Sequence, residues 1–89
     1  MNTYHLIDKP VKATQWTGNL KVFRNALEMM LKTDSIALMV TMDEIFIACK
    51  EWTGRMMVGE YFACFVNLYD GESYWTATPK AWFEERYQL

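Results

Sequence analysis

Hydrophobic and polar residues follow two different periods along the chain. Between residues 19 and 32, apolar side chains recur every three or four positions while polar ones share the opposite face. The apolar positions are Leu20, Phe23, Leu27, Met30 and Leu31. This spacing predicts an amphipathic helix with Asn19 as its N-cap. Val22, Ala26 and Met29 widen the apolar stripe, so we expect the helix either to pack deeply or to contact a partner as well.

An alternation of period two predicts strands on both sides of this helix. The predicted strands are 10–16, 36–42, 45–49, 57–69 and 72–78, followed by a short last strand at 86–89. A tight turn near Met42 and Asp43 would make a hairpin, 51–55 reads as a loop, and Gly59 predicts an irregularity within the long strand. Asp70 and Gly71 predict a two-residue type I′ turn.

Two smaller patterns complete the picture. Thr78 followed by Pro79 is typical of an N-cap and first helical residue, so residues 79–84 are predicted to form one helical turn. The triplet Trp-Thr-Gly occurs at 16–18 and again at 52–54, and a strand that ends in a glycine turn would account for both. Together the elements predict a single α+β domain, 1–89, in which one amphipathic helix packs on a strongly bent antiparallel sheet of five to six strands.

The composition indicates that part of the surface of this domain is apolar. A chain of 89 residues forms one domain, and 52% of its residues are hydrophobic. When a domain of this size folds, a large share of the surface of the unfolded chain stays exposed. Some apolar side chains are therefore expected to contact another protein or a second copy. The net charge of −2 argues against direct nucleic-acid binding, which needs a basic face.

The sequence also bears on compartment. The first ten residues lack the pattern of a secretory signal, and the longest apolar run, 61–66, is far too short to span a bilayer. We therefore expect a protein without a membrane segment that stays in the cytoplasm where it is made. Cys49, which follows Ala48 in a β-like segment, and Cys64, between Ala63 and Phe65, are expected to be buried free thiols.

Candidate chemistry favours binding over catalysis. The chain has one histidine, His5, scattered glycines, and carboxylates that cluster only at turns, so neither a catalytic triad nor a metal or cofactor site is predicted. We predict that the protein is not an enzyme. Four Trp and five Tyr are many for this length, and these residue types are enriched at interface hot spots.

The aromatic residues divide into core and candidate contacts. Trp16 and Trp82 are assigned to the core. Trp52 lies in the polar segment EWTGRMM beside Arg55, and is either an exposed anchor that contacts a protein or stacks on a base, or a buried loop tryptophan. The hairpin after residue 68 forms an acidic and aromatic tip, or simply a solvated turn. Its candidate contact residues are Tyr69, Asp70, Glu72 and Tyr74.

Three segments resemble a known group of proteins. The start KPVKATQWTGN (9–19), the segment VGEYF (58–62) and the ending TPKAWFEERY (78–87) resemble small proteins of tailed bacteriophages and prophages with a Pro-Gly-Asp-Tyr-Gly type signature. Val58 stands where that signature has Pro, and Glu60 where it has Asp. The resemblance implies a phage origin and a small β-rich fold, and it brings no established activity.

Two functions follow as hypotheses. The first is a phage accessory protein that binds and inhibits a host protein of CRISPR, restriction or transcription systems, through the acidic hairpin and the Trp52 segment. The alternative is a homo-oligomer that sequesters a nucleotide-like signal, with an aromatic ring on the base and Arg55, Lys12 or the Gly59 backbone at the phosphate. A minor virion or assembly component is a third possibility.

Overall fold

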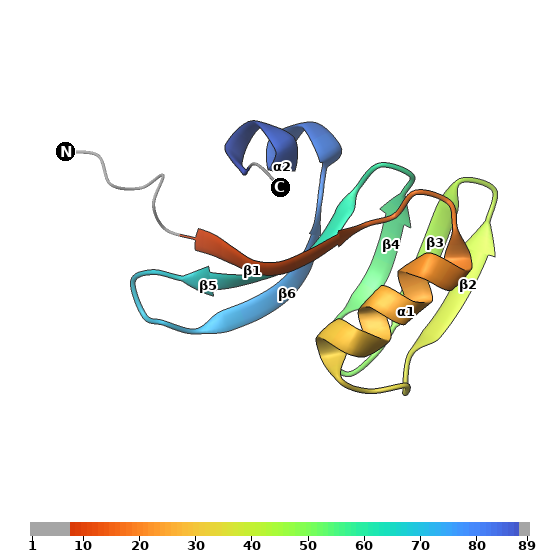
Figure 1. Cartoon of the computed structure of the whole chain (residues 1–89), viewed down its shortest axis with the longest axis horizontal. Coiled ribbons are helices and arrows are strands. Elements are labelled where there is room, and N and C mark those ends of the chain that lie inside the picture. The colour runs from red at the N-terminus through yellow and green to blue at the C-terminus, as the bar shows by residue number, and fades with distance from the viewer. Residues whose placement is uncertain (1–7, 88–89) are drawn as a thin grey trace.

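The computed structural model describes residues 8–87; His5 and residues 88–89 of the predicted last strand lie outside this part. This part contains eight elements in chain order, which Figure 1 labels. They are β1 (Asp8–Gln15), α1 (Leu20–Leu31), β2 (Ala37–Thr41), β3 (Glu44–Ala48), β4 (Thr53–Met57), β5 (Tyr61–Asn67), β6 (Ser73–Thr78) and α2 (Lys80–Arg86). The α+β class is confirmed. Arg86, predicted to begin the last strand, ends α2 instead.

The strands form two antiparallel sheets, so the prediction of one bent sheet of five to six strands is wrong. The sheet called the first sheet below has the strand order β1-β5-β6, and the second sheet has the order β2-β3-β4 (Figure 1). The predicted strand 57–69 is divided by a complete turn, because Gly59 adopts φ +104° and Glu60 N–H donates to the Met57 carbonyl at 3.0 Å. The irregularity expected at Gly59 therefore separates two strands that belong to different sheets.

The predicted loop 51–55 is also wrong, since it contains most of β4. Cys49 N–H donates to the Trp52 carbonyl at 3.1 Å, which closes a short connection and brings the chain back onto β3. β4 then pairs with β3 in unbroken register from Thr53 opposite Ala48 to Met57 opposite Glu44. The sequence pattern did not indicate this strand, because the segment contains polar residues and Met56 is the one buried side chain of β4.

The main core lies between α1 and the second sheet. Asn19 caps the helix as predicted, its side-chain oxygen accepting from Val22 N–H at 3.2 Å. The helix buries three residues against this core, and each large side chain buried contributes about 1.5–3 kcal/mol. The fully buried residues of this core include Phe23, Leu27, Ile45, Ile47, Met56, Trp16 and Phe62. Val22 and Met29 stay exposed on the helix, whereas Ala26 is half-buried.

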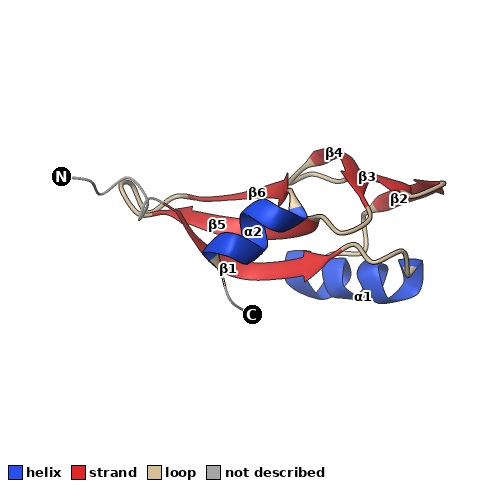
Figure 2. Ribbon diagram, turned by 90° about the horizontal axis from the view of Figure 1, so that it is seen from above, coloured by secondary structure: helices blue, strands red, loops and turns tan. Residues whose placement is uncertain are grey.

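A smaller core lies between α2 and the first sheet. Figure 2 shows α2 lying over this sheet in the view from above. Phe83 of α2 is fully buried against Tyr61, and their rings stack with centroids 4.3 Å apart. Thr78 is not the N-cap that the sequence predicted. It is the last residue of β6, paired with Tyr61, and the cap position falls on Pro79.

The two predicted hairpins form, with one difference in the turns. β2 and β3 are joined by Met42 and Asp43, as expected. The β5–β6 connection is not a two-residue type I′ turn, because that turn needs positive φ at both central residues and Asp70 does not have it. Five residues, 68–72, connect β5 to β6 instead, and Asn67 N–H donates to the Glu72 carbonyl at 2.8 Å.

Candidate binding surfaces

The six candidate residues from the sequence lie in two separate places. Arg55 belongs to β4 of the β2-β3-β4 sheet and Trp52 to the connection just before that strand, whereas Tyr69, Asp70, Glu72 and Tyr74 belong to the β5–β6 hairpin. In Figure 1 the loop of this hairpin reaches away from the second sheet, toward the opposite end of a molecule 44 Å long. The structure therefore does not bring the two groups together into one site.

The hairpin end, residues 68–72, is an ordered loop with exposed side chains. Asn67 Oδ1 accepts from Tyr69 N–H at 2.8 Å, and Asp70 Oδ1 accepts from Glu72 N–H at 2.9 Å. The Tyr69 side chain is 69% exposed, and both carboxylates are exposed as well. Within the described residues, none of the salt bridges involves Asp70 or Glu72. The arrangement can present an aromatic ring together with two acidic groups to a basic partner.

Tyr74 and Trp82 both lie on the side of the first sheet that α2 covers. Both rings contact Phe65, with centroids 5.7 Å and 6.2 Å away. Trp82 is 36% exposed, so its assignment to the core is wrong. Phe83 fills the buried position of this short helix, and Trp82 instead carries the Arg86 guanidinium 4.6 Å above its ring. The spacing of four residues between them was the sequence signal for this cation–π pair.

Trp52 packs against the main core, which is nearer to the buried-loop alternative than to the exposed anchor. It is half-buried, and its ring meets Phe62 edge-on with centroids 5.4 Å apart. The ring also covers Gly54 so closely that a Cβ atom there would lie 2.6 Å from it. Because side chains alternate along a strand, Arg55 points to the opposite face of the sheet from the Gly54 position. Trp52 and Arg55 therefore do not share a face.

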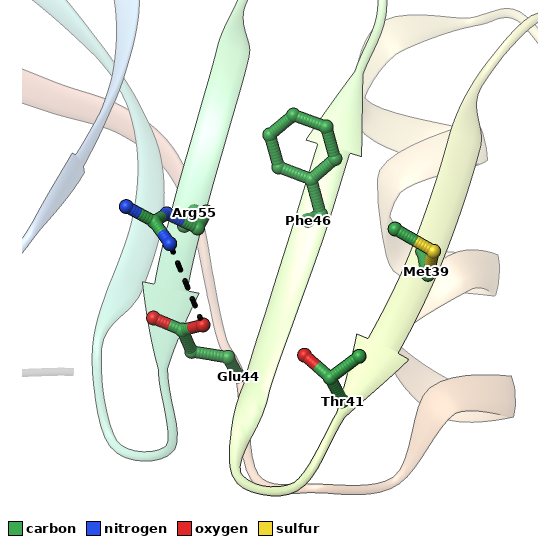
Figure 3. A pocket seen from close by; sticks show the side chains of 5 residues that line it. All are labelled: Met39, Thr41, Glu44, Phe46 and Arg55. Atoms are coloured by element: carbon green, nitrogen blue, oxygen red, sulfur yellow. Dashed lines mark ion pairs between the residues drawn. The ribbon is translucent and has the colours of Figure 1, made fainter.

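Arg55 lies on the outer face of the second sheet, above an open depression of about 480 Å³ (Figure 3). The register places Met39, Phe46 and Arg55 side by side on β2, β3 and β4. The Arg55 guanidinium lies 3.9 Å from Glu44, as the dashed line in Figure 3 marks. The sequence analysis did not select Met39 or Phe46. Their exposure follows from alternation with the inward residues Leu38, Ile45 and Ile47.

The phosphate-binding groups of the nucleotide hypothesis are already engaged. Gly59 N–H donates to the Trp16 carbonyl at 2.7 Å, and the Gly59 carbonyl accepts from Gln15 Nε2 at 3.1 Å. Lys12 Nζ lies 3.4 Å from the Met30 carbonyl at the end of α1. Among residues 8–87, no group of three or more His, Cys, Asp and Glu side chains could hold a metal ion. The non-enzyme assignment stays a prediction.

A hydrogen-bonded triad fastens α2 to the first sheet. Tyr61 Oη donates to Glu84 at 2.8 Å, and Lys80 Nζ donates to the other carboxylate oxygen at 3.1 Å. These hydrogen bonds lower the pKa of Glu84, the one from Tyr61 most. The same bond to Glu84, together with burial, raises the pKa of Tyr61. The triad therefore holds a neutral phenol against an ionised carboxylate.

Comparison of this chain with models of protein families, with curated protein sequences and with solved structures finds no match. The resemblance to phage proteins stays a prediction. No helix in the described part of the chain has the length and apolar character needed to cross a membrane.

Proposed function

We propose that this chain is a small phage accessory protein that binds a host protein and inhibits it by occupying its surface. The β5–β6 hairpin end is the main contact. The observation that carries the proposal is the placement of Tyr69, Asp70 and Glu72 together, exposed, on an ordered loop at one end of the molecule. The phage origin and the host target rest on the sequence resemblance.

The chemistry of the hairpin end defines the partner surface. Tyr69 offers a large amphipathic ring with few rotatable bonds, which suits an interface anchor. Asp70 and Glu72 complement Lys and Arg side chains, and such complementarity accelerates encounter and fixes register. A basic groove that otherwise binds nucleic acid is the kind of host surface that this hairpin end would fit. Because the loop is hydrogen-bonded internally, little ordering entropy is lost when it binds.

The aromatic pair Tyr74 and Trp82 extends this contact along the first sheet. Both rings are partly exposed and share Phe65 as a floor, so they can pack on a partner without a change of conformation. Arg55 lies on the other sheet and has no part in this surface. Trp52, which packs inward, acts in this proposal through stability.

The experiment uses a partner that is first captured by cross-linking in the bacterial host, then identified and purified. Binding of the wild type is compared with that of Tyr69→Ala and of Asp70→Asn/Glu72→Gln. Asp34→Asn/Glu51→Gln removes two exposed charges elsewhere and serves as the matched control. We expect the hairpin variants to weaken binding at least about tenfold and to relieve inhibition, with the control unchanged. Equal binding by all variants would remove the hairpin from the interface.

The sequestration of a nucleotide-like signal has less support. Arg55 and Phe46 line one depression, but the Glu44 carboxylate already lies 3.9 Å from the guanidinium, and Gly59 N–H is bonded to the Trp16 carbonyl. Native mass spectrometry of protein purified from its host distinguishes the two functions. A stoichiometric nucleotide carried by a defined oligomer would favour sequestration over inhibition of a host protein.

A further inference from the structure

The second sheet ends at β2, which hydrogen-bonds to β3 alone among the described elements. Four of the five residues of β2 are exposed. An uncovered edge strand presents unpaired backbone N–H and C=O groups, and it can pair with a strand of another chain.

The hydrogen-bond pattern identifies which backbone groups lie at this free edge. Val58 N–H donates to Asp43 and Cys49 N–H to Trp52, so the odd-numbered residues of β3 direct their backbone groups toward β4. The even-numbered residues therefore bond to β2, where their partners are Ala37, Met39 and Thr41. It follows that Leu38 and Val40 direct their N–H and C=O groups outward.

β2 lacks the features by which proteins block edge strands. Residues 37–41, ALMVT, contain no charge, proline or glycine, and their pairing with β3 has no bulge. The other edges differ. β1 contains Pro10 and a register shift beside it. On β4, Arg55 adds a charge and the Met57 N–H donates to Glu60 Oε1 at 2.8 Å. The second half of β6 is half-buried to buried. Edge protection is thus weakest at β2.

We propose that β2 pairs antiparallel with β2 of a second copy, about a two-fold axis at Met39, to form one continuous six-stranded sheet. In this register Leu38 lies opposite Val40 of the second copy, and each such pair exchanges two backbone hydrogen bonds. The outward groups at Leu38 and Val40 are the ones this register needs. Met39 lies opposite its own copy at a non-hydrogen-bonded position, where side chains come closest.

The charges of the sheet favour a second copy as the occupant. A two-fold axis places each residue near its own equivalent, so a charged edge would repel itself, and β2 is uncharged. On the outer face, the row through the axis would run Arg55, Phe46, Met39, then Met39, Phe46 and Arg55 of the second copy. Its four central side chains are apolar, and each cation at its ends has Glu44 of its own chain beside it. Met39, 59% exposed, and Phe46, 40% exposed, would gain cover.

The dimer leaves the hairpin end of each copy free, because that loop belongs to the other sheet. The inference is therefore independent of the proposed function.

The first test removes one outward hydrogen bond. Val40→Pro deletes a backbone N–H that β3 does not use, and Val40→Thr is the matched control that keeps it. Sedimentation velocity over a range of protein concentrations should show a concentration-dependent dimer for the wild type and for Val40→Thr. Val40→Pro should weaken dimerisation roughly tenfold or more while circular dichroism stays native. A wild type that is monomeric at all concentrations, or a folded proline variant that dimerises equally well, would overturn the proposal.

The second test reads the register and needs no proline. Opposite residues in antiparallel strands have Cβ atoms about 4.5–5.5 Å apart, so Met39→Cys should form an intermolecular disulfide on mild oxidation. Thr41→Cys is the control, since its own copy would lie about four strand positions, or roughly 13 Å, away. We expect cross-linking of Met39→Cys to be at least about tenfold faster. Equal rates would exclude this register, and with it the proposed two-fold axis.

Discussion

The indole ring of Trp52 lies directly over Gly54, two residues further along the chain, where a Cβ atom would come within 2.6 Å of the ring. This contact explains why a glycine occurs inside β4, where it is ordinarily unfavourable. The ring takes the space that a side chain at position 54 would use, and it reaches Phe62 of the first sheet. Trp52 thereby joins the two sheets through the core.

Gly54→Ala is accordingly expected to destabilise the protein, by about 1–3 kcal/mol, because the new methyl group must displace the ring. Urea unfolding measures the effect, with Thr53→Ala at an exposed neighbour as the control. In a Trp52→Ala background the same glycine substitution should cost much less, which a double-mutant cycle detects. An equal cost in both backgrounds would place the strain in the backbone.

Met42→Gly is expected to stabilise the β2–β3 turn. Met42 has φ +55° and is 96% exposed, so its side chain gains little contact while its backbone occupies a region that favours glycine. The gain should be about 0.5–1 kcal/mol in the free energy of unfolding. Met57→Gly, at an exposed strand position with ordinary φ, should lose stability instead. A loss at both positions would argue against strain at Met42.

The Tyr61, Glu84 and Lys80 triad predicts a pH dependence. The pKa of Glu84 is lower in the folded protein than in the unfolded chain, so between these two values the unfolded state binds more protons. Stability from this group is therefore present above the unfolded-state pKa and is lost as the pH falls through the folded value. Urea unfolding from pH 6 down to pH 3 should show a steeper loss for the wild type than for Glu84→Gln. Parallel curves would remove Glu84 from the acid response.

Tyr61 makes the opposite contribution in alkali. Its folded-state pKa is raised, so the stability it supplies is complete below the unfolded-state pKa and is lost as the pH rises through the folded one. Tyr61→Phe should therefore flatten the alkaline limb of the stability curve, and spectrophotometric titration of tyrosine should lose a component that titrates above the ordinary tyrosine value. A wild type whose tyrosines all titrate at the ordinary value would contradict this assignment.

The charges at the hairpin end should matter little to folding. Asp70→Asn keeps the side-chain oxygen that accepts from Glu72 N–H, and Glu72 itself is exposed. The double variant Asp70→Asn/Glu72→Gln should therefore unfold within about 0.5 kcal/mol of the wild type. Thermal and urea unfolding check this. A large loss would assign these carboxylates to stability and weaken their assignment to a binding surface.

Local signals in the sequence predicted α1, its Asn19 cap and the β2–β3 hairpin, because period and capping chemistry act within a few residues. The two-sheet arrangement was not predicted, because the same glycine signal at Gly59 fits a bulge or a complete turn. The two Trp-Thr-Gly triplets show the same limit. Gly18 lies in a turn with φ +97°, whereas Gly54 lies inside β4 beneath a tryptophan ring.

The candidate surfaces show where sequence reasoning stops. The hairpin residues Tyr69, Asp70 and Glu72 were selected from turn chemistry and composition, and the structure exposes them. Trp82 and Trp52 were harder to assign, since a large aromatic ring suits a core and an interface equally. Phe83 takes the buried position of α2 and leaves Trp82 partly exposed. Gly54 has no side chain, which leaves space for the ring of Trp52 to pack inward.

The order of strands in the two sheets also sets the route by which the chain can fold. β2, β3 and β4 follow one another through short turns, so their pairing closes only small loops. β1 must wait for β5, since Gln15 pairs with Tyr61 and Asp8 with Asn67, far along the chain. The loop-closure entropy of that pairing is larger. We therefore expect the half that contains α1 and the β2-β3-β4 sheet to fold first. β1 can pair only later, once β5 is available as its partner.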